Sequence, residues 1–175
     1  MGISLQNRQK RIRVETRWLR KVGEKALSIL AHPRAECSVV LVDDAAMEIL
    51  NHTYRGVPSP TDVLAFPMTE GRFRRVSPDV LGDVVISIET ARRQARTAGG
   101  EIQAELALLL IHGMLHLVGY DHGGAVERRA MQRAERRILT ACGISISAKA
   151  SVTRRGRLQR QGSALSGTGR RGGTR

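Results

Sequence analysis

From residue 12 onward, the spacing of apolar residues switches between helical and strand-like patterns. Apolar residues between positions 12 and 30 recur at intervals of three and four, which predicts an amphipathic helix. Residues 37–42 (CSVVLV) form a β-branched run typical of a buried strand. Asp43 follows this run and can cap a second helix, which extends to about Tyr54. A rhythm of strand and helix therefore begins in the first third of the chain.

Two more strands and a helix follow in the middle of the chain. Residues 62–66 (DVLAF) and 80–86 (VLGDVVI) have the composition of strands, and a long polar loop joins them. Ser87 can cap the next helix, and Gly99-Gly100 is expected to end it. This order of strands and helices is typical of a sheet that is covered by helices.

The helix predicted for residues 101–118 is apolar nearly all round, so we expect it to be the buried central helix. Gly119 is its predicted end, and an amphipathic helix follows over residues 126–139. The length and apolar content suit one domain, and no internal repeat is visible. We therefore predict a single domain over residues 1–146.

The charge is distributed unevenly along the chain. Its formal net charge is +13, and no acidic residue follows Glu135. Residues 147–175 hold eight of the 29 Lys and Arg residues and are rich in Gly and Ser, which predicts a disordered tail. Such a tail can be a solubilising extension or a nonspecific arm that binds RNA phosphates. Both interpretations stay open.

Cysteine usage and hydropathy indicate a cytoplasmic protein. Cys37 and Cys142 are far apart and form no metal-binding pair, which favours a reducing compartment. The N-terminal segment has no apolar core of a signal peptide, and the longest apolar run, Leu106–Ile111, is far shorter than a membrane span. We expect no membrane partner.

The segment HGMLHLVGYDH holds three histidines at intervals of four and six. On a helix, His112 and His116 lie on one face and can direct ring nitrogens at one point. Gly119 can end the helix in a left-handed conformation and let the chain return His122 to the same point. Three imidazoles with no evident fourth protein ligand predict one catalytic Zn²⁺ per chain with an open position.

This spacing is that of metzincin proteases, with one difference. Metzincins carry a glutamate general base directly after the first histidine, and this chain has Gly113 there. A peptidase needs that base beside the metal. The missing glutamate and the excess of positive charge favour a substrate other than a peptide.

A second segment, NHTYRGVPSPTDVLAFP, suggests phosphate binding. Arg55 precedes a stiff turn with Pro58 and Pro60, and a guanidinium held there can form paired hydrogen bonds to phosphate oxygens. Asp62 can cap the turn before its strand. Asp83 lies inside a predicted strand, where it can face the metal as a base or, as we favour, orient a histidine through its far nitrogen.

HGMLHLVGYDH, NHTYRGVPSPTDVLAFP and LGDVVIS together resemble the YbeY family of bacterial endoribonucleases, from about residue 3 to Cys142. The resemblance implies a small α+β domain in which a mixed sheet of about four strands packs with about five helices. It also implies a metzincin-like zinc helix, with Zn²⁺ held by His112, His116 and His122.

The family's activity implies hydrolysis of single-stranded RNA, 3′ end maturation of small-subunit ribosomal RNA and ribosome quality control. The expected partners are single-stranded RNA, ribosomal RNA and the small ribosomal subunit, and no DNA. The family's arginine falls on Arg55 and its LGD aspartate on Asp83. The chain departs from the family at Pro58-Ser59, Ala65 and Gly123-Gly124, which leaves the histidines intact.

We therefore expect a zinc-dependent endoribonuclease in which the metal polarises a phosphoryl oxygen or acidifies a bound water, and in which Arg55 is a catalytic residue that steadies that phosphate. The general base stays open between Asp83, a water activated by the metal and the 2′-hydroxyl of the RNA. Two other classes are a metalloprotease and a ribosome-associated RNA-binding factor. The second would need a structural zinc with a fourth protein ligand, for which Cys37 is the candidate.

Overall fold

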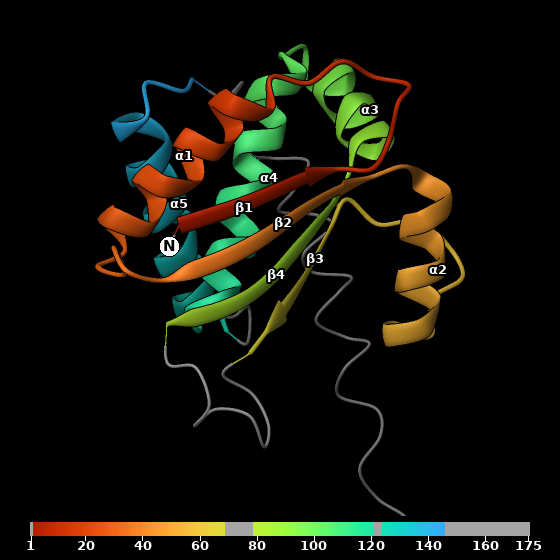
Figure 1. Cartoon of the computed structure of the whole chain (residues 1–175). Helices are drawn as coiled ribbons and strands as arrows, with labels where there is room; N and C mark the ends of the chain where they lie inside the picture. Colours follow the sequence, from red (N-terminus) through yellow and green to blue (C-terminus); the bar gives the residue numbers. More distant parts are fainter. Residues whose placement is uncertain (1, 69–78, 121–123, 146–175) are drawn as a thin grey trace, which may run out of the picture.

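The computed structural model describes residues 2–68, 79–120 and 124–145 and contains five helices and four strands within them (Figure 1). In chain order, the elements are β1 (Gly2–Asn7), α1 (Thr16–Ile29), β2 (Glu36–Val42), α2 (Asp44–Arg55), β3 (Val63–Pro67), β4 (Val80–Ser87), α3 (Ile88–Ala98), α4 (Ile102–Leu117) and α5 (Ala125–Ala141). All five predicted helices and all three predicted strands are confirmed, with ends shifted by a few residues.

The sheet is mixed, as the resemblance implied. Its strand order is β1-β2-β4-β3, with β1, β2 and β4 parallel to one another. β3 runs antiparallel to β4 and forms one edge, with Ala65 opposite Val84. The α+β class is therefore confirmed, and the antiparallel strand lies at the edge of a parallel core.

The first strand, β1, was not predicted from the sequence. Its apolar content is only Ile3 and Leu5, too short an alternation to stand out in a polar N-terminal segment. In the structure Ile3 is buried opposite Cys37, beside the backbone of Gly23 in α1. The strand forms because β2 offers its edge and α1 covers the apolar side chain.

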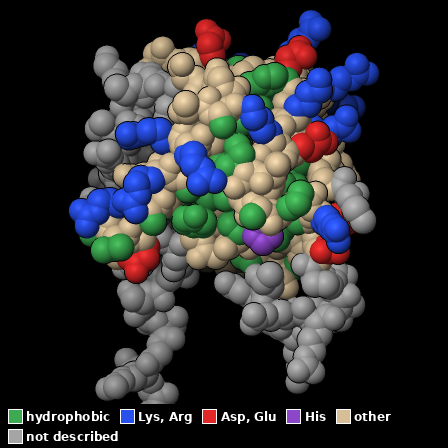
Figure 2. Space-filling model, turned by 90° about the vertical axis from the view of Figure 1, so that its left-hand side faces the viewer, with side chains coloured by type: hydrophobic (Ala, Val, Ile, Leu, Met, Phe, Trp, Pro, Cys, Tyr) green, Lys and Arg blue, Asp and Glu red, His purple; other side chains and the backbone are tan. Residues whose placement is uncertain are grey.

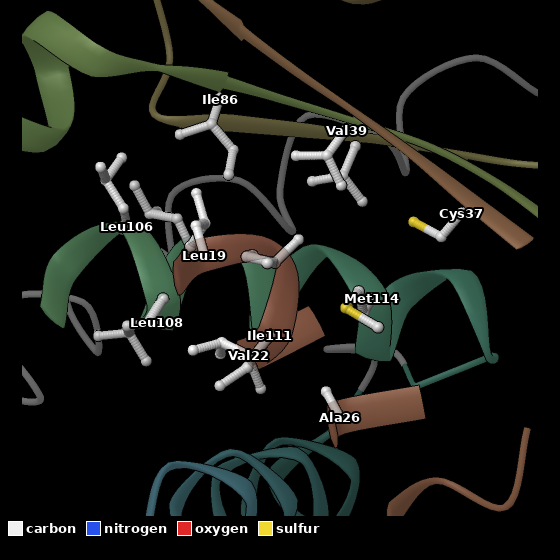
Figure 3. Packing of buried hydrophobic residues seen from close by; sticks show 14 of the residues in the cluster. Leu19, Val22, Ala26, Cys37, Val39, Ile86, Leu106, Leu108, Ile111 and Met114 are labelled. Carbon is white, nitrogen blue, oxygen red and sulfur yellow. The ribbon is translucent and has the colours of Figure 1, made fainter. Parts of the chain in front are cut away.

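Four helices cover one face of the sheet, and α2 covers part of the other (Figure 1). Figure 3 shows the main core, in which Leu19 of α1 and Ile111 of α4 lie beneath Val39 of β2 and Ile86 of β4. On the opposite face, Met47 of α2 packs in a smaller cluster with Val42, Leu64 and Val85. Because α4 is buried among helices and strands, it provides a rigid support for side chains near its C-terminal end.

The predicted helix caps are present. The Asp43 carboxylate accepts a hydrogen bond from the backbone N–H of Ala46 at 2.9 Å, and the Ser87 hydroxyl accepts one from Thr90 at 3.3 Å. Gly119, the predicted end of α4, has φ of +93°, which a residue with a side chain rarely adopts. The chain therefore turns away directly after α4.

Several segments for which the sequence gives predictions lie outside the described residues. They are most of the polar loop before β4, His122 with its neighbours, and the basic tail. The boundary between domain and tail stays a prediction. Within the described ranges, no helix is both long and apolar enough to cross a lipid bilayer.

Candidate metal centre

Helix α4 places two of the three predicted ligands side by side. The Nε2 atoms of His112 and His116 lie 3.2 Å apart, and their rings meet edge to face with centroids 4.8 Å apart. The His112 side chain is buried, whereas His116 is partly exposed. The pair therefore lies at the border between the core and solvent, where a substrate can reach it.

This geometry fits one shared metal ion. Two imidazole nitrogens that bind zinc at about 2.05 Å in a tetrahedral arrangement lie about 3.3 Å apart. The observed 3.2 Å is close to that value. Within the described ranges no group of three or more His, Cys, Asp or Glu side chains is arranged to bind a metal, so Cys37 does not join the pair. His122, the third predicted ligand, lies outside these ranges.

Glu135 of α5 holds His112 from the side opposite His116. Its Oε1 lies 2.5 Å from Nδ1 of His112, and both side chains are largely buried. A carboxylate at Nδ1 favours the tautomer with the proton on that nitrogen, which leaves the Nε2 lone pair for a metal. Nδ1 of His112 thus faces Glu135, whereas Nε2 of the same ring faces His116.

Glu135 was not predicted as a site residue. The sequence feature that could have indicated Glu135 is its position in α5, where it lies on the buried side of the helix beside Met131 and Ile138. A carboxylate on an apolar helix face needs a partner. The sequence could not say that this partner is a histidine 23 residues earlier.

Gly113 explains why the protease base is missing. A Cβ atom at this position would lie 2.6 Å from Cγ1 and 3.1 Å from Cγ2 of Val84, and 3.4 Å from Val63. The side of α4 between the histidines therefore packs directly against β4 and β3. Any side chain at this position, a glutamate included, would require Val84 to shift.

Arg55 ends α2, and Gly56 caps the helix in a left-handed conformation. The preceding residue, Tyr54, meets Phe66 of β3 with ring centroids 4.8 Å apart, on the sheet face opposite α4. The Arg55 guanidinium has no hydrogen bond or ion pair with any described residue, so the structure offers no acidic partner that would occupy it. The structure does not bring Arg55 into contact with the histidine pair.

Asp83 also lies on the face opposite α4. Its neighbour Val84 packs against α4 at Gly113, and because side chains alternate along a strand, Asp83 points the other way. It is exposed and lines a groove of about 670 Å³ with Arg8, Tyr54 and Phe66. The favoured role of orienting a histidine is therefore filled at His112 by Glu135, not by Asp83.

The electrostatic neighbour of Asp83 within the sheet is the thiol of Cys37. Burial raises the pKa of the Cys37 thiol to about 12, and the charge of Asp83 adds to this effect. Cys37 is therefore a neutral side chain of the buried core at physiological pH.

Asp62 has the structural role expected for it. One carboxylate oxygen accepts the backbone N–H of Val63 at 2.9 Å, and the other accepts the amide of Gln94 at 2.9 Å. These contacts close the turn before β3 and tie it to α3.

Comparison with known proteins identifies related sequences over most of the domain. A family model described as endoribonuclease YbeY matches residues 4–143. A protein from Geobacter sulfurreducens named endoribonuclease YbeY is 46% identical over 140 residues, which span 79% of this chain and 93% of the relative. A protein of the same name from Syntrophus aciditrophicus is 38% identical over 140 residues, 79% of this chain and 88% of the relative.

A solved structure has the same fold. The solution structure of a protein from Thermotoga maritima is similar with a TM-score of 0.55 and 24% sequence identity, covering 97% of this chain and 99% of that one. At this identity the likeness supports the fold alone.

Proposed function

The chain belongs to the endoribonuclease YbeY family, and on that premise we propose that it is a zinc-dependent endoribonuclease that cuts single-stranded RNA. Its proposed substrate is ribosomal RNA. Its proposed roles are 3′ end maturation of small-subunit rRNA and ribosome quality control, with the small ribosomal subunit as partner and the cytoplasm as location. Each relative described above carries the name endoribonuclease.

One observation carries the zinc part of the proposal. His112 and His116 present Nε2 atoms 3.2 Å apart while Glu135 occupies the far nitrogen of His112. Metal-bound histidines commonly have such a carboxylate partner. When bound, zinc would polarise a phosphoryl oxygen and acidify a water molecule. The protein's own contribution is to fix the two rings on a buried helix.

Arg55 is proposed to bind a phosphate of the same RNA strand away from the cut bond. It follows Tyr54, which contacts Phe66 on one face of the edge strand β3, whereas Gly113 and the histidines lie on the other face. An RNA strand that wraps over the edge of the sheet at β3 would contact Arg55 on one face and the histidines on the other. The guanidinium suits the task because it binds phosphate oxygens in pairs and has no described partner.

The orientation of Asp83 is evidence against this residue as the general base. Because Asp83 points away from α4, we propose either attack by water or attack by the 2′-hydroxyl of the RNA itself. The cleavage products separate these two routes. A 2′,3′-cyclic phosphate would identify the 2′-hydroxyl as the nucleophile, and a 5′-phosphate would identify water.

The metalloprotease alternative is opposed by Gly113, which stands where the glutamate base would be and packs closely against Val84. The alternative with a structural zinc loses its candidate fourth ligand, because Cys37 is not grouped with the histidines of the described chain.

The test compares two forms of one RNA that spans the 3′ end of precursor small-subunit rRNA. The zinc-loaded protein is expected to cut the free strand and to leave the same strand uncut when a complementary strand covers it. Arg55→Ala is expected to raise KM more than it lowers kcat, because Arg55 binds RNA away from the cut bond. Equal cleavage of both RNA forms, or cleavage of casein instead, would overturn the proposal.

A further inference from the structure

Helices α1 and α5 present an unusual concentration of exposed positive charge. Their exposed acids are Glu15, Glu24 and Glu127. Against these three stand eight exposed Lys and Arg residues: Arg17, Arg20, Lys21, Lys25, Arg129, Arg133, Arg136 and Arg137. Figure 2 views the molecule from the side of these helices and shows Lys and Arg side chains spread over it, with few Asp and Glu.

The two helices form one continuous surface because they lie antiparallel and touch. The Lys25 ammonium donates to the backbone oxygen of Ala141, and the Arg137 guanidinium donates to that of Ile29 at 3.0 Å. These two contacts pair the end of α1 with the end of α5 in opposite directions (Figure 1). The exposed cations of α1 and those of α5 therefore lie on one continuous surface.

The charge on α5 has a regular spacing. Arg129, Arg133 and Arg136 follow one another at intervals of four and three, which places them on a single outward stripe. With a rise of about 1.5 Å per residue, neighbours on the stripe lie about 6 Å and about 4.5 Å apart along the helix. Met131 and Ile138 occupy the buried side of the same helix.

The stripe also lies close to the candidate metal centre. Glu135 contacts His112 from the inner side of α5, while Arg133 and Arg136 on either side of it in sequence are exposed. A nucleic acid on the outer side of α5 would thus be one helix away from the histidines. The chain continues from this surface into residues 147–175, whose eight basic residues carry the same sign of charge.

We propose that the outer faces of α1 and α5 form a second RNA-binding surface, which holds the phosphate backbone of a helical rRNA segment next to the single strand at the metal centre. This inference rests on the proposed function, because it takes the substrate to be RNA. The surface offers guanidinium and ammonium groups, which bind phosphates without reading sequence. Its binding is therefore independent of base sequence and strongly dependent on salt.

The test uses two triple variants of the full zinc-loaded chain with the same net charge. The first is Arg129→Gln, Arg133→Gln and Arg136→Gln on α5. The matched control is Lys10→Gln, Arg92→Gln and Arg96→Gln, three exposed cations away from this surface. The probe is a fluorescein-labelled RNA hairpin with 2′-O-methyl sugars, titrated at several salt concentrations.

The α5 variant is expected to bind the hairpin at least tenfold more weakly, with a salt slope reduced by about 3, whereas the control stays close to the original protein. An equal loss in both variants, or no loss in the α5 variant, would overturn the proposal. The control variant should cut a short unpaired RNA like the original protein. If even the original protein fails to cut it, the proposed function fails while the binding result still decides this inference.

Discussion

Glu135 Oε1 lies 2.5 Å from Nδ1 of His112, so a carboxylate on α5 fixes the ring that α4 places beside His116. The contact joins two consecutive helices at the candidate metal centre, through residues that are 23 positions apart in the sequence. It makes the orientation of a proposed zinc ligand depend on the packing of α5 against α4.

Removing this carboxylate should weaken metal binding without unfolding the protein. Glu135→Ala is expected to raise the zinc dissociation constant about 10- to 100-fold, the usual cost of losing such a partner. The zinc dissociation constant of Glu135→Gln should lie between those of the original protein and Glu135→Ala, because the amide oxygen of the glutamine still accepts a hydrogen bond from Nδ1 of His112. Competition with a chromophoric chelator measures the constant.

The control for this prediction is Glu127→Gln, an exposed acid in the first turn of the same helix. Its zinc affinity should match that of the original protein. If Glu135→Ala binds zinc as tightly as this control, the contact has no role in orienting His112.

The close contact between Gly113 and Val84 predicts a specific pattern of stability. Gly113→Ala should gain about 1 kcal/mol of helix propensity, but overpacking against Val84 should cost about 1 to 3 kcal/mol. The expected net result is a loss in the free energy of unfolding, measured by urea denaturation.

A double-mutant cycle separates this packing effect from other causes. Val84→Ala removes the atoms that a new Cβ would meet. The double variant should therefore be at least about 1 kcal/mol more stable than the sum of the two single effects predicts. Strict additivity would mean that the helix and strand do not press together at this point.

Asp44 predicts a dependence of stability on acid pH. Burial alone would raise its pKa, but hydrogen bonds from Arg93, Ser87 and Thr90 outweigh burial and lower the pKa below its usual value. A carboxyl with a lowered folded-state pKa stabilises the protein above its unfolded-state pKa, and this contribution is lost as pH falls through the folded-state pKa.

Asp44→Asn is therefore expected to lower the free energy of unfolding by about 1 kcal/mol at neutral pH. The difference from the original protein should shrink as pH falls below about 4, the usual range of an aspartate. Glu48→Gln, an exposed change on the same helix, should show no such trend. A difference for Asp44→Asn that stays constant down to acid pH would contradict this account.

The basic tail is expected to contribute to affinity for RNA and not to the chemistry. A chain that ends at residue 146 lacks eight positive charges. Its affinity for long RNA should fall and depend less steeply on salt. Cleavage of a short unpaired RNA should be unchanged. A tail that only aids solubility would leave the RNA affinity unaltered.

Features with a local signal could be predicted from the sequence. Asp43, Ser87 and Gly119 end or begin helices through their own side chain or backbone freedom, and the structure agrees at all three. His112 and His116 also follow from local geometry, because a spacing of four residues on a helix brings two side chains together.

Features that depend on tertiary partners could not be predicted in this way. β1 forms because β2 offers an edge, and its own apolar pattern is only two residues long. The direction of Asp83 depends on which face of β4 meets α4, and a single strand segment does not reveal this. The partner of Glu135 depends on how two helices pack.

The central claim is that one zinc ion at the histidines of α4 enables RNA cleavage. The most direct measurement determines bound zinc per chain and the rate of cleavage of single-stranded RNA for His116→Ala and for the control His52→Ala, an exposed histidine on α2. We expect one zinc per chain and full cleavage in the control, and loss of both in His116→Ala with the fold retained. Cleavage that persists in a folded His116→Ala protein without zinc would contradict the account.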